Sequence, residues 1–313
     1  MKLERVIFVI LLLATGGAVA YYSGSLPGMT RAAEHRFNFG GIGRGNGQFE
    51  YPRALAVSPV DGCVFVIDKT ARVQRFSPDG KHELTWHMPE VKNGKPTGIF
   101  IDQQNQIWVP DTHYARVIGF DRDGNELFSF GERGHGPGQF IFPTSVAIDS
   151  EGFIYVSEYG GNDRVSKFTP EFEYVMSFAN DKAGEGWMNR PQTLLIDEDD
   201  VIWATDSCGH RICRFDTSGK FLGALDIEWP NDETAEFSYP FGLDEDDAGR
   251  LLVSDRGNNR IVRLQKSGKV DGIWGLAGRA ETQIRQPWAV SAGDGRRVYC
   301  LDSWNNRVQV IDW

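Results

Sequence analysis

The sequence predicts an all-β protein, a six-bladed β-propeller whose last blade is closed by an N-terminal strand. Three observations lead to this prediction. The same markers recur six times at nearly constant spacing, each repeat contains short strand-like runs separated by turns, and the sixth repeat lacks a fourth strand that is found near the beginning of the chain instead. With 41% hydrophobic and 24% charged residues among 313, the composition is that of a globular protein.

Three markers define the repeat. A proline opens an apolar run at Pro52, Pro96, Pro143, Pro191, Pro240 and Pro287, with spacings of 44 to 49 residues. An acidic residue ends the next run at Asp68, Asp111, Glu158, Asp206, Asp255 and Asp302, and an arginine follows at Arg72, Arg116, Arg164, Arg211, Arg260 and Arg307. Because the acid and the arginine bracket one turn, we expect an ion pair across a hairpin, which is a scaffold contact repeated six times.

The third repeat illustrates the four strands. Runs rich in β-branched and aromatic residues cover 143–149, 153–158, 164–168 and 174–178, separated by Gly, Asp and Ser clusters. The sixth repeat ends after its third strand, and residues 35–40 (HRFNFG) match 126–131 (ELFSFG), the fourth strand of the second repeat. The N-terminal strand is therefore predicted to complete the last blade, leaving no long unpaired edge.

At this point the repeats resemble the NHL family. The resemblance rests on three segments, GIGRGNGQFEYPRALAV at 41–57, GERGHGPGQFIFPTSVAID at 131–149 and LLVSDRGNNRIVRL at 251–264. It covers residues 35–313. The second, fourth and sixth repeats lack the glycine-rich lead before the proline. The leads that are present are followed by strands, so they are expected to be flexible connections between blades and not phosphate-binding loops.

The resemblance implies several functions, because NHL propellers include binding platforms, receptor modules and a peptide-amidating lyase. In the lyase branch, zinc-binding histidines follow the first-strand prolines. The corresponding residues here are Arg53, Thr97, Thr144, Gln192, Phe241 and Trp288. None is a histidine, and none is the Glu, Asn or Asp that calcium-dependent lactonases use. We therefore expect a binding or scaffolding module with no cofactor and no resident reaction; the alternative is a metal-dependent propeller enzyme, lyase-like or lactonase-like, with its site elsewhere.

A ligand-binding surface is predicted at one mouth of the central channel, where the segments entering the first strands meet the turns that follow the recurrent acids. The residues collected there are Arg53, Lys69, His113, Tyr159, Phe241, Arg256, Trp288 and Trp304. Arginine and aromatic residues dominate binding hot spots. A protein partner, or an anionic or carbohydrate-like ligand, is the expected occupant. The opposite end collects acidic turns, among them Asp102, Asp149 and 197–200, and is expected to be a solvated face.

Charge excludes nucleic acid as a general partner. The chain has 33 Lys and Arg against 43 Asp and Glu, a net charge of −10, which is the opposite of what binding to a phosphate backbone requires.

Cys208, His210 and Cys213 form a candidate metal site, because thiolate and imidazole ligands cluster within six residues. The alternative is a hairpin turn with an incidental histidine. Cys208 and Cys213 are also close enough in sequence to form a disulfide, and buried free thiols are the other reading.

The first residues have the pattern of a targeting segment. Lys2 and Arg5 precede an apolar run at 6–14, and small residues follow at 18–20. Residues 1–22 are interpreted as a signal peptide or a membrane anchor, 23–34 as a linker and 35–313 as the propeller. Either interpretation places the propeller outside the cytoplasm, and the second adds an N-terminal membrane association.

Overall fold

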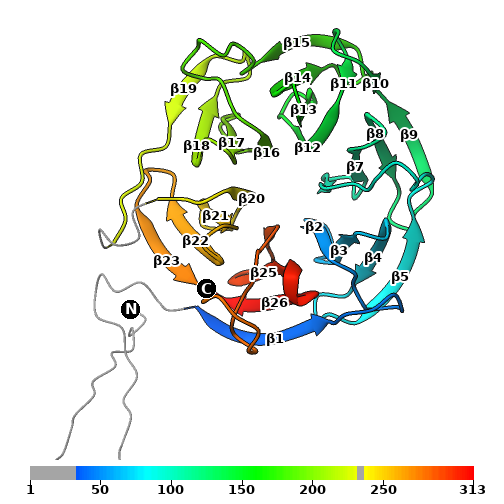
Figure 1. Ribbon diagram of the computed structural model, residues 1–313, viewed down its shortest axis with the longest axis vertical. Coiled ribbons are helices and arrows are strands. Elements are labelled where there is room, and N and C mark those ends of the chain that lie inside the picture. Colours follow the sequence, from blue (N-terminus) through cyan, green and yellow to red (C-terminus); the bar gives the residue numbers. More distant parts are fainter. Residues whose placement is uncertain (1–32, 231–235) are drawn as a thin grey trace, which may run out of the picture.

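The structure is a computed structural model that describes residues 33–230 and 236–313. Figure 1 shows six small sheets arranged as a ring around a central opening, with the first strand of each sheet innermost. The predicted six-bladed propeller is therefore confirmed. The predictions for residues 1–22, and nearly all of the predicted linker, lie outside the described residues. No described segment is a helix of the length and hydrophobicity needed to cross a bilayer.

Each blade is a four-stranded antiparallel sheet. The first two blades contain β2 (Pro52–Val57), β3 (Val64–Asp68), β4 (Arg72–Phe76) and β5 (His82–His87), then β6 (Phe100–Ile101), β7 (Ile107–Asp111), β8 (Arg116–Phe120) and β9 (Glu126–Phe130). The third and fourth contain β12 (Phe142–Ile148), β13 (Ile154–Tyr159), β14 (Arg164–Phe168) and β15 (Tyr174–Phe178), then β16 (Pro191–Ile196), β17 (Ile202–Asp206), β18 (Arg211–Phe215) and β19 (Phe221–Ala224). The fifth contains β20 (Pro240–Glu245), β21 (Arg250–Asp255), β22 (Arg260–Gln265) and β23 (Val270–Trp274).

The sixth blade combines both ends of the described chain. It contains β24 (Val290–Ala292), β25 (Arg297–Asp302), β26 (Arg307–Asp312) and, as its outer strand, β1 (Glu34–Gly40). β1 pairs antiparallel with β26, with Glu34 opposite Asp312 and Gly40 opposite Arg307. The predicted closure by the N-terminal strand is confirmed, since β1 and β26 lie side by side at the two ends of the described chain (Figure 1).

Two first strands are shorter than the repeat pattern suggests. β6 spans two residues and β24 three. Contrary to the prediction, the sixth repeat does have a lead of the same kind, in which Ala277 pairs in parallel with Ile284 as Ile42 does with Phe49. In the second blade, Pro96 and Pro110 stand on the two facing segments, and a proline supplies no N–H for a ladder.

The hydrophobic core consists of six clusters, each between neighbouring blades. One cluster joins Phe65 and Ile67 of the first blade to Ile107 and Ile118 of the second. Another joins the last blade to the first through Phe39, Leu55, Tyr299 and Val308. Because the cores lie between the blades, the central channel is left for other side chains.

The six predicted ion pairs are formed, with N···O distances of 2.7 to 3.1 Å in five of them and Arg72 paired with Asp68 in the first blade. The arginines do more than neutralise the acids. Arg72 also donates to the carbonyl oxygens of Gly43, Arg44, Gly45 and Gln48. Arg164 does the same for Gly136 and Gln139 in the third repeat.

The glycine-rich leads of the first and third repeats are therefore hydrogen-bonded to the recurrent arginines. Within the lead of the third repeat, β10 (Glu132–Arg133) and β11 (Gln139–Phe140) pair as a short parallel ladder.

Candidate functional site

The mouth of the channel is assembled by hydrogen bonds that cross from one blade to the next. The residue before the recurrent proline has a positive φ in four blades, at Tyr51, Arg190, Tyr239 and Gln286. Its N–H donates to a side chain on the turn of the preceding blade: Asn306 receives from Tyr51 (2.7 Å), Asp163 from Arg190 (2.9 Å), His210 from Tyr239 (3.1 Å) and Asn259 from Gln286 (2.9 Å). These bonds bring the entering segments and the turns together at one end of the ring, as the sequence predicts.

Arginine and aromatic side chains alternate around this mouth. The guanidinium carbon of Arg53 lies 5.6 Å from the ring centre of Tyr51 and 5.7 Å from that of Trp288. On the other side of Trp288, the guanidinium of Arg256 lies 5.1 Å from the indole and 4.9 Å from Phe241. Trp288 and Phe241 meet edge to face at 5.0 Å. One aromatic ring thus serves two arginines, a cation–π arrangement.

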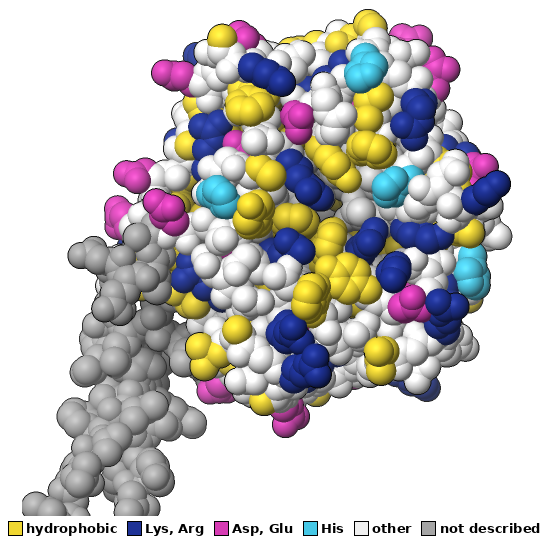
Figure 2. Space-filling view, viewed as in Figure 1, with side chains coloured by type: hydrophobic (Ala, Val, Ile, Leu, Met, Phe, Trp, Pro, Cys, Tyr) yellow, Lys and Arg dark blue, Asp and Glu magenta, His cyan; other side chains and the backbone are white. Residues whose placement is uncertain are grey.

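The ring continues through the fourth and third blades. Arg190 lies 5.8 Å from Phe241 and 4.7 Å from Tyr159. Tyr159 stacks on Phe142 at 5.3 Å, and the His113 imidazole contacts Phe142 at 5.4 Å. We call Tyr51, Arg53, Tyr159, Arg190, Phe241, Arg256 and Trp288 the mouth cluster. Figure 2 shows a face of the ring on which hydrophobic and basic side chains gather around the central opening, while acidic ones lie mostly toward the perimeter.

The electrostatics of the mouth follow from burial and from the gathered positive charge. Burial lowers the pKa of Arg53, an effect that the phenols of Tyr51 and Tyr159 partly oppose. Burial also lowers the pKa of His113, and the neighbouring Arg53, Arg133 and Lys95 lower it further. His113 is therefore neutral at pH 7, and the positive charge resides on the arginines.

Several buried polar atoms at the mouth have no hydrogen-bond partner among the described residues. They are the Nε–H groups of Arg53, Arg190 and Arg256 and the indole N–H of Trp288. The Oε1 atom of Gln192, which is 4% exposed and follows Pro191, is also without a partner. Buried donors without acceptors are uncommon in native proteins, because each costs about 1–3 kcal/mol. Similar donors without a partner also occur away from the mouth, at Trp86 and Arg214, but those of the mouth cluster surround one opening.

The predicted mouth residues mostly come together, with two differences. Phe241 is only 2% exposed, so it supports Arg190 and Arg256 from below and does not face a ligand, contrary to prediction. The Lys69 ammonium lies at the rim, 3.8 Å from Glu50. Trp304 is 48% exposed, and its indole N–H donates to the Tyr51 hydroxyl at 2.9 Å.

Sequence reasoning missed Tyr51, Arg190 and Phe142. All three immediately precede a recurrent proline. Collecting the residue before each proline, as well as the one after it, would have found them.

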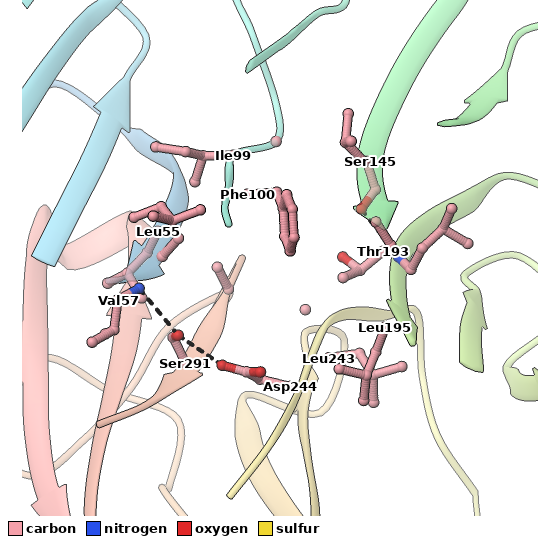
Figure 3. Close-up of a pocket in the computed structure, with 18 of the residues that line it drawn as sticks. Leu55, Val57, Ile99, Phe100, Ser145, Thr193, Leu195, Leu243, Asp244 and Ser291 are labelled. Atoms are coloured by element: carbon pink, nitrogen blue, oxygen red, sulfur yellow. Dashed lines mark hydrogen bonds between the residues drawn. The ribbon is translucent and has the colours of Figure 1, made fainter. Parts of the chain in front are cut away.

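Beneath the mouth, the channel is a cavity of about 750 Å³ lined by the six first strands. Leu55, Ile99, Leu195 and Leu243 contribute apolar wall, as Figure 3 shows. Toward the other end, the Ser291 hydroxyl donates to Asp244 at 2.7 Å and accepts from the N–H of Val57 at 3.3 Å, which links the sixth blade to the fifth and the first (Figure 3). Burial raises the pKa of Asp244, although its hydrogen bonds oppose the shift.

Three acids at the far end are not the solvated residues that the sequence suggests. Asp102, Asp149 and Asp197 are 7–8% exposed. They accept hydrogen bonds from Trp108 (2.8 Å), the Tyr155 hydroxyl (2.9 Å) and Trp203 (2.8 Å). These carboxylates anchor aromatic side chains within the blades, whereas Glu198 and Asp199 beside them are exposed.

The cysteine and histidine candidate does not converge. Cys213 is buried in the core between the third and fourth blades, and the His210 ring accepts the Tyr239 N–H and packs against the Tyr239 ring at 4.7 Å. Cys63, Cys208, Cys213 and Cys300 are free thiols. In the described ranges, no group of three or more His, Cys, Asp and Glu side chains is placed to hold a metal ion.

Sequence comparison gives three informative relatives. The chain is 28% identical to Protein brain tumor of Drosophila melanogaster over 129 residues, 41% of this chain and 12% of that protein. It is 25% identical to NHL repeat-containing protein 3 of Mus musculus over 190 residues, 55% and 54% of the two. It is 29% identical to peptidylglycine alpha-amidating monooxygenase of Rattus norvegicus over 136 residues, 40% and 14%. The chain thus spans about half the length of one of these relatives and a small part of the others. No family model matches it.

Solved structures of similar fold include a streptogramin B lyase, with a TM-score of 0.60 at 16% identity over 88% of both chains. A putative gluconolactonase has a TM-score of 0.63 at 15% identity over 89% of this chain and 93% of that one. At such identities the likeness shows the fold alone. The chain is thus a six-bladed β-propeller whose repeats are similar to those of NHL repeat-containing proteins.

Proposed function

We propose that this propeller is an extracytoplasmic binding or scaffolding module that captures a ligand or a protein partner at the mouth cluster and catalyses no reaction itself. One observation carries the proposal: the Nε–H groups of Arg53, Arg190 and Arg256 are buried at the mouth without a partner in the described part of the chain. The extracytoplasmic location rests on the basic, apolar and small-residue pattern of residues 2–20.

A metal-dependent enzyme is the second candidate, favoured by the 29% identity to an amidating monooxygenase. The channel residues do not fit a histidine-bound zinc, because the positions after the recurrent prolines are Arg, Thr, Thr, Gln, Phe and Trp. Metal analysis of the purified protein separates the two candidates. Stoichiometric zinc or calcium that survives dialysis would favour the enzyme.

Substitution of the mouth tests the binding proposal. A variant with Arg53→Gln, Arg256→Gln and Trp304→Ala should lose the partner that the wild-type protein retains from an envelope extract, with affinity weakened about thirtyfold or more, since anchors of these types each contribute about 2 kcal/mol. The matched control is Glu198→Lys with Asp199→Lys at the far end, which should bind as the wild type does. A mouth variant that folds and still captures the same partner at full affinity would show that the wrong face is assigned.

A further inference from the structure

The charge of the mouth cluster is uncompensated. Arg53, Arg190 and Arg256 each have aromatic neighbours, but none forms an ion pair with a described carboxylate within 4.0 Å. Two recurrent arginines nearby are paired. Arg211 forms an ion pair with Asp206 and Arg260 one with Asp255, with N···O distances of 2.9 and 2.7 Å. Three formal positive charges without an ion-pair partner thus lie together at the mouth of an acidic protein.

The aromatic neighbours prepare these arginines for an anion. A guanidinium group whose flat face lies against a ring keeps its N–H edge for hydrogen bonds, and side-chain freedom is already reduced before binding. Trp288 lies against both Arg53 and Arg256, and Phe241 lies against both Arg256 and Arg190, so the three cations are held around one opening.

We propose that Arg53, Arg190 and Arg256 together bind one dianionic oxyanion, the phosphate or dicarboxylate group of a small ligand. The inference rests on the proposed function and specifies the chemistry of the ligand at that site. A neutral sugar would satisfy the N–H donors but leave three half-buried charges unpaired, and a monoanion would leave two. Oxyanions accept paired N–H bonds from arginine, which makes the charge-assisted hydrogen bonds that this cluster lacks.

Titration calorimetry with inorganic phosphate and with malonate, on the full chain at pH 7.5 and low ionic strength, tests the proposal. Wild-type protein should bind at least one of the two at one site per chain, and added NaCl should weaken the binding. Arg190→Gln and Arg256→Gln should each reduce the affinity at least about tenfold, and the double variant should show no measurable binding. Phosphate binding alone, malonate binding alone or both would each support the site and identify the preferred oxyanion.

Arg214→Gln is the matched control. The Arg214 guanidinium also lies against an indole, 5.7 Å from Trp203, and its Nε–H is also without a partner, but it stands on β18 away from the mouth. This variant should keep wild-type affinity. Circular dichroism and melting temperature check folding, and if Arg190→Gln fails to fold, Arg256→Gln carries the test alone.

Absence of saturable binding of either anion, or equal loss in Arg214→Gln, would overturn the inference. The outcome is separable from that of the proposed function. If the mouth variant loses its partner while neither oxyanion binds, the ligand chemistry is wrong and the face is right. If an oxyanion binds as expected while the mouth variant still captures the partner, the oxyanion site stands and the proposed partner surface fails.

Discussion

Asp111 shows how one missing backbone donor changes a repeated acid. In five blades, an N–H group two residues before the proline donates to the recurrent acid, from Glu50, Ile141, Asn189, Ser238 and Arg285, at 2.6 to 3.1 Å. In the second repeat, the Oδ1 atom of Asp111 has no partner among the described residues. Burial raises the pKa of Asp111 to about 6, although Arg116 at 3.1 Å opposes the shift.

This shift predicts a pH dependence that a single substitution can isolate. Because the folded pKa lies above the unfolded 3.8, protonated Asp111 favours folding; its contribution is complete below pH 4 and is lost as the pH rises through 6. Asp111→Asn should therefore gain stability relative to the wild type between pH 4 and pH 7, by up to about 3 kcal/mol. Urea unfolding of both proteins at the two pH values measures this. A difference that is constant with pH would contradict the assignment.

At the scale of the element, the recurrent arginine connects a turn to the lead of its own blade through an ion pair and hydrogen bonds. Arg72 is 5% exposed, neutralises Asp68 and donates to four lead carbonyls. Arg116 stands at the same position of the second blade, is 24% exposed, and its ion-pair partners are Asp111 and Glu90. The two arginines occupy the same position in the repeat, but Arg72 also bonds to the carbonyl groups of a lead, whereas the side chain of Arg116 forms ion pairs with two acids.

Arg72→Leu should therefore destabilise the protein far more than Arg116→Leu. Loss of Arg72 leaves the buried Asp68 charge and several carbonyl groups uncompensated, at a cost of about 3–5 kcal/mol. Loss of Arg116 should cost less, because Asp111 already has a raised pKa and can accept a proton. Chemical unfolding at pH 7 compares the two variants. Equal losses would mean that the contacts to the lead contribute little.

The elements were predictable from sequence to different degrees. Strand runs, the acid–arginine pairs and β1 as the closing strand could be predicted, because each leaves a periodic or matching pattern. The position of Arg190 before a recurrent proline is visible in the sequence, but its placement at the mouth depends on a positive φ and on an N–H bond to Asp163 in the preceding blade, which the sequence does not show. Nor could the burial of Phe241 be predicted, since the sequence does not distinguish a side chain that points toward a neighbouring ring from one that points toward the channel.

At the scale of the whole molecule, stability depends on closing the ring. Each core cluster lies between two blades, so every blade needs both neighbours to bury its apolar faces. β1 contributes Phe39 to the cluster between the sixth and first blades, with Phe37 packed against it, and its ladder with β26 completes the sixth sheet. A ring of this kind depends on the closing strand and not on where that strand stands in the chain.

The last prediction follows from that geometry. Glu34 faces Asp312, so β26 and β1 are already placed as a hairpin that lacks only its connection. In the first blade, the five residues 77–81 connect the corresponding strands β4 and β5. A permuted chain that begins at Gly41 and carries residues 33–40 after Trp313, through a three-residue linker, provides a connection of the same length.

The permuted chain should melt within about 5 °C of the unpermuted chain. A chain that begins at Gly41 without β1 should melt at least about 10 °C lower, because it exposes two phenylalanines and a strand edge. Calorimetry of both, beside a chain that begins at Arg31, measures the effect. If the shortened chain were as stable as the one that begins at Arg31, β1 would not close the ring; if the permuted chain were as unstable as the shortened one, strand position in the chain would matter as well as strand presence.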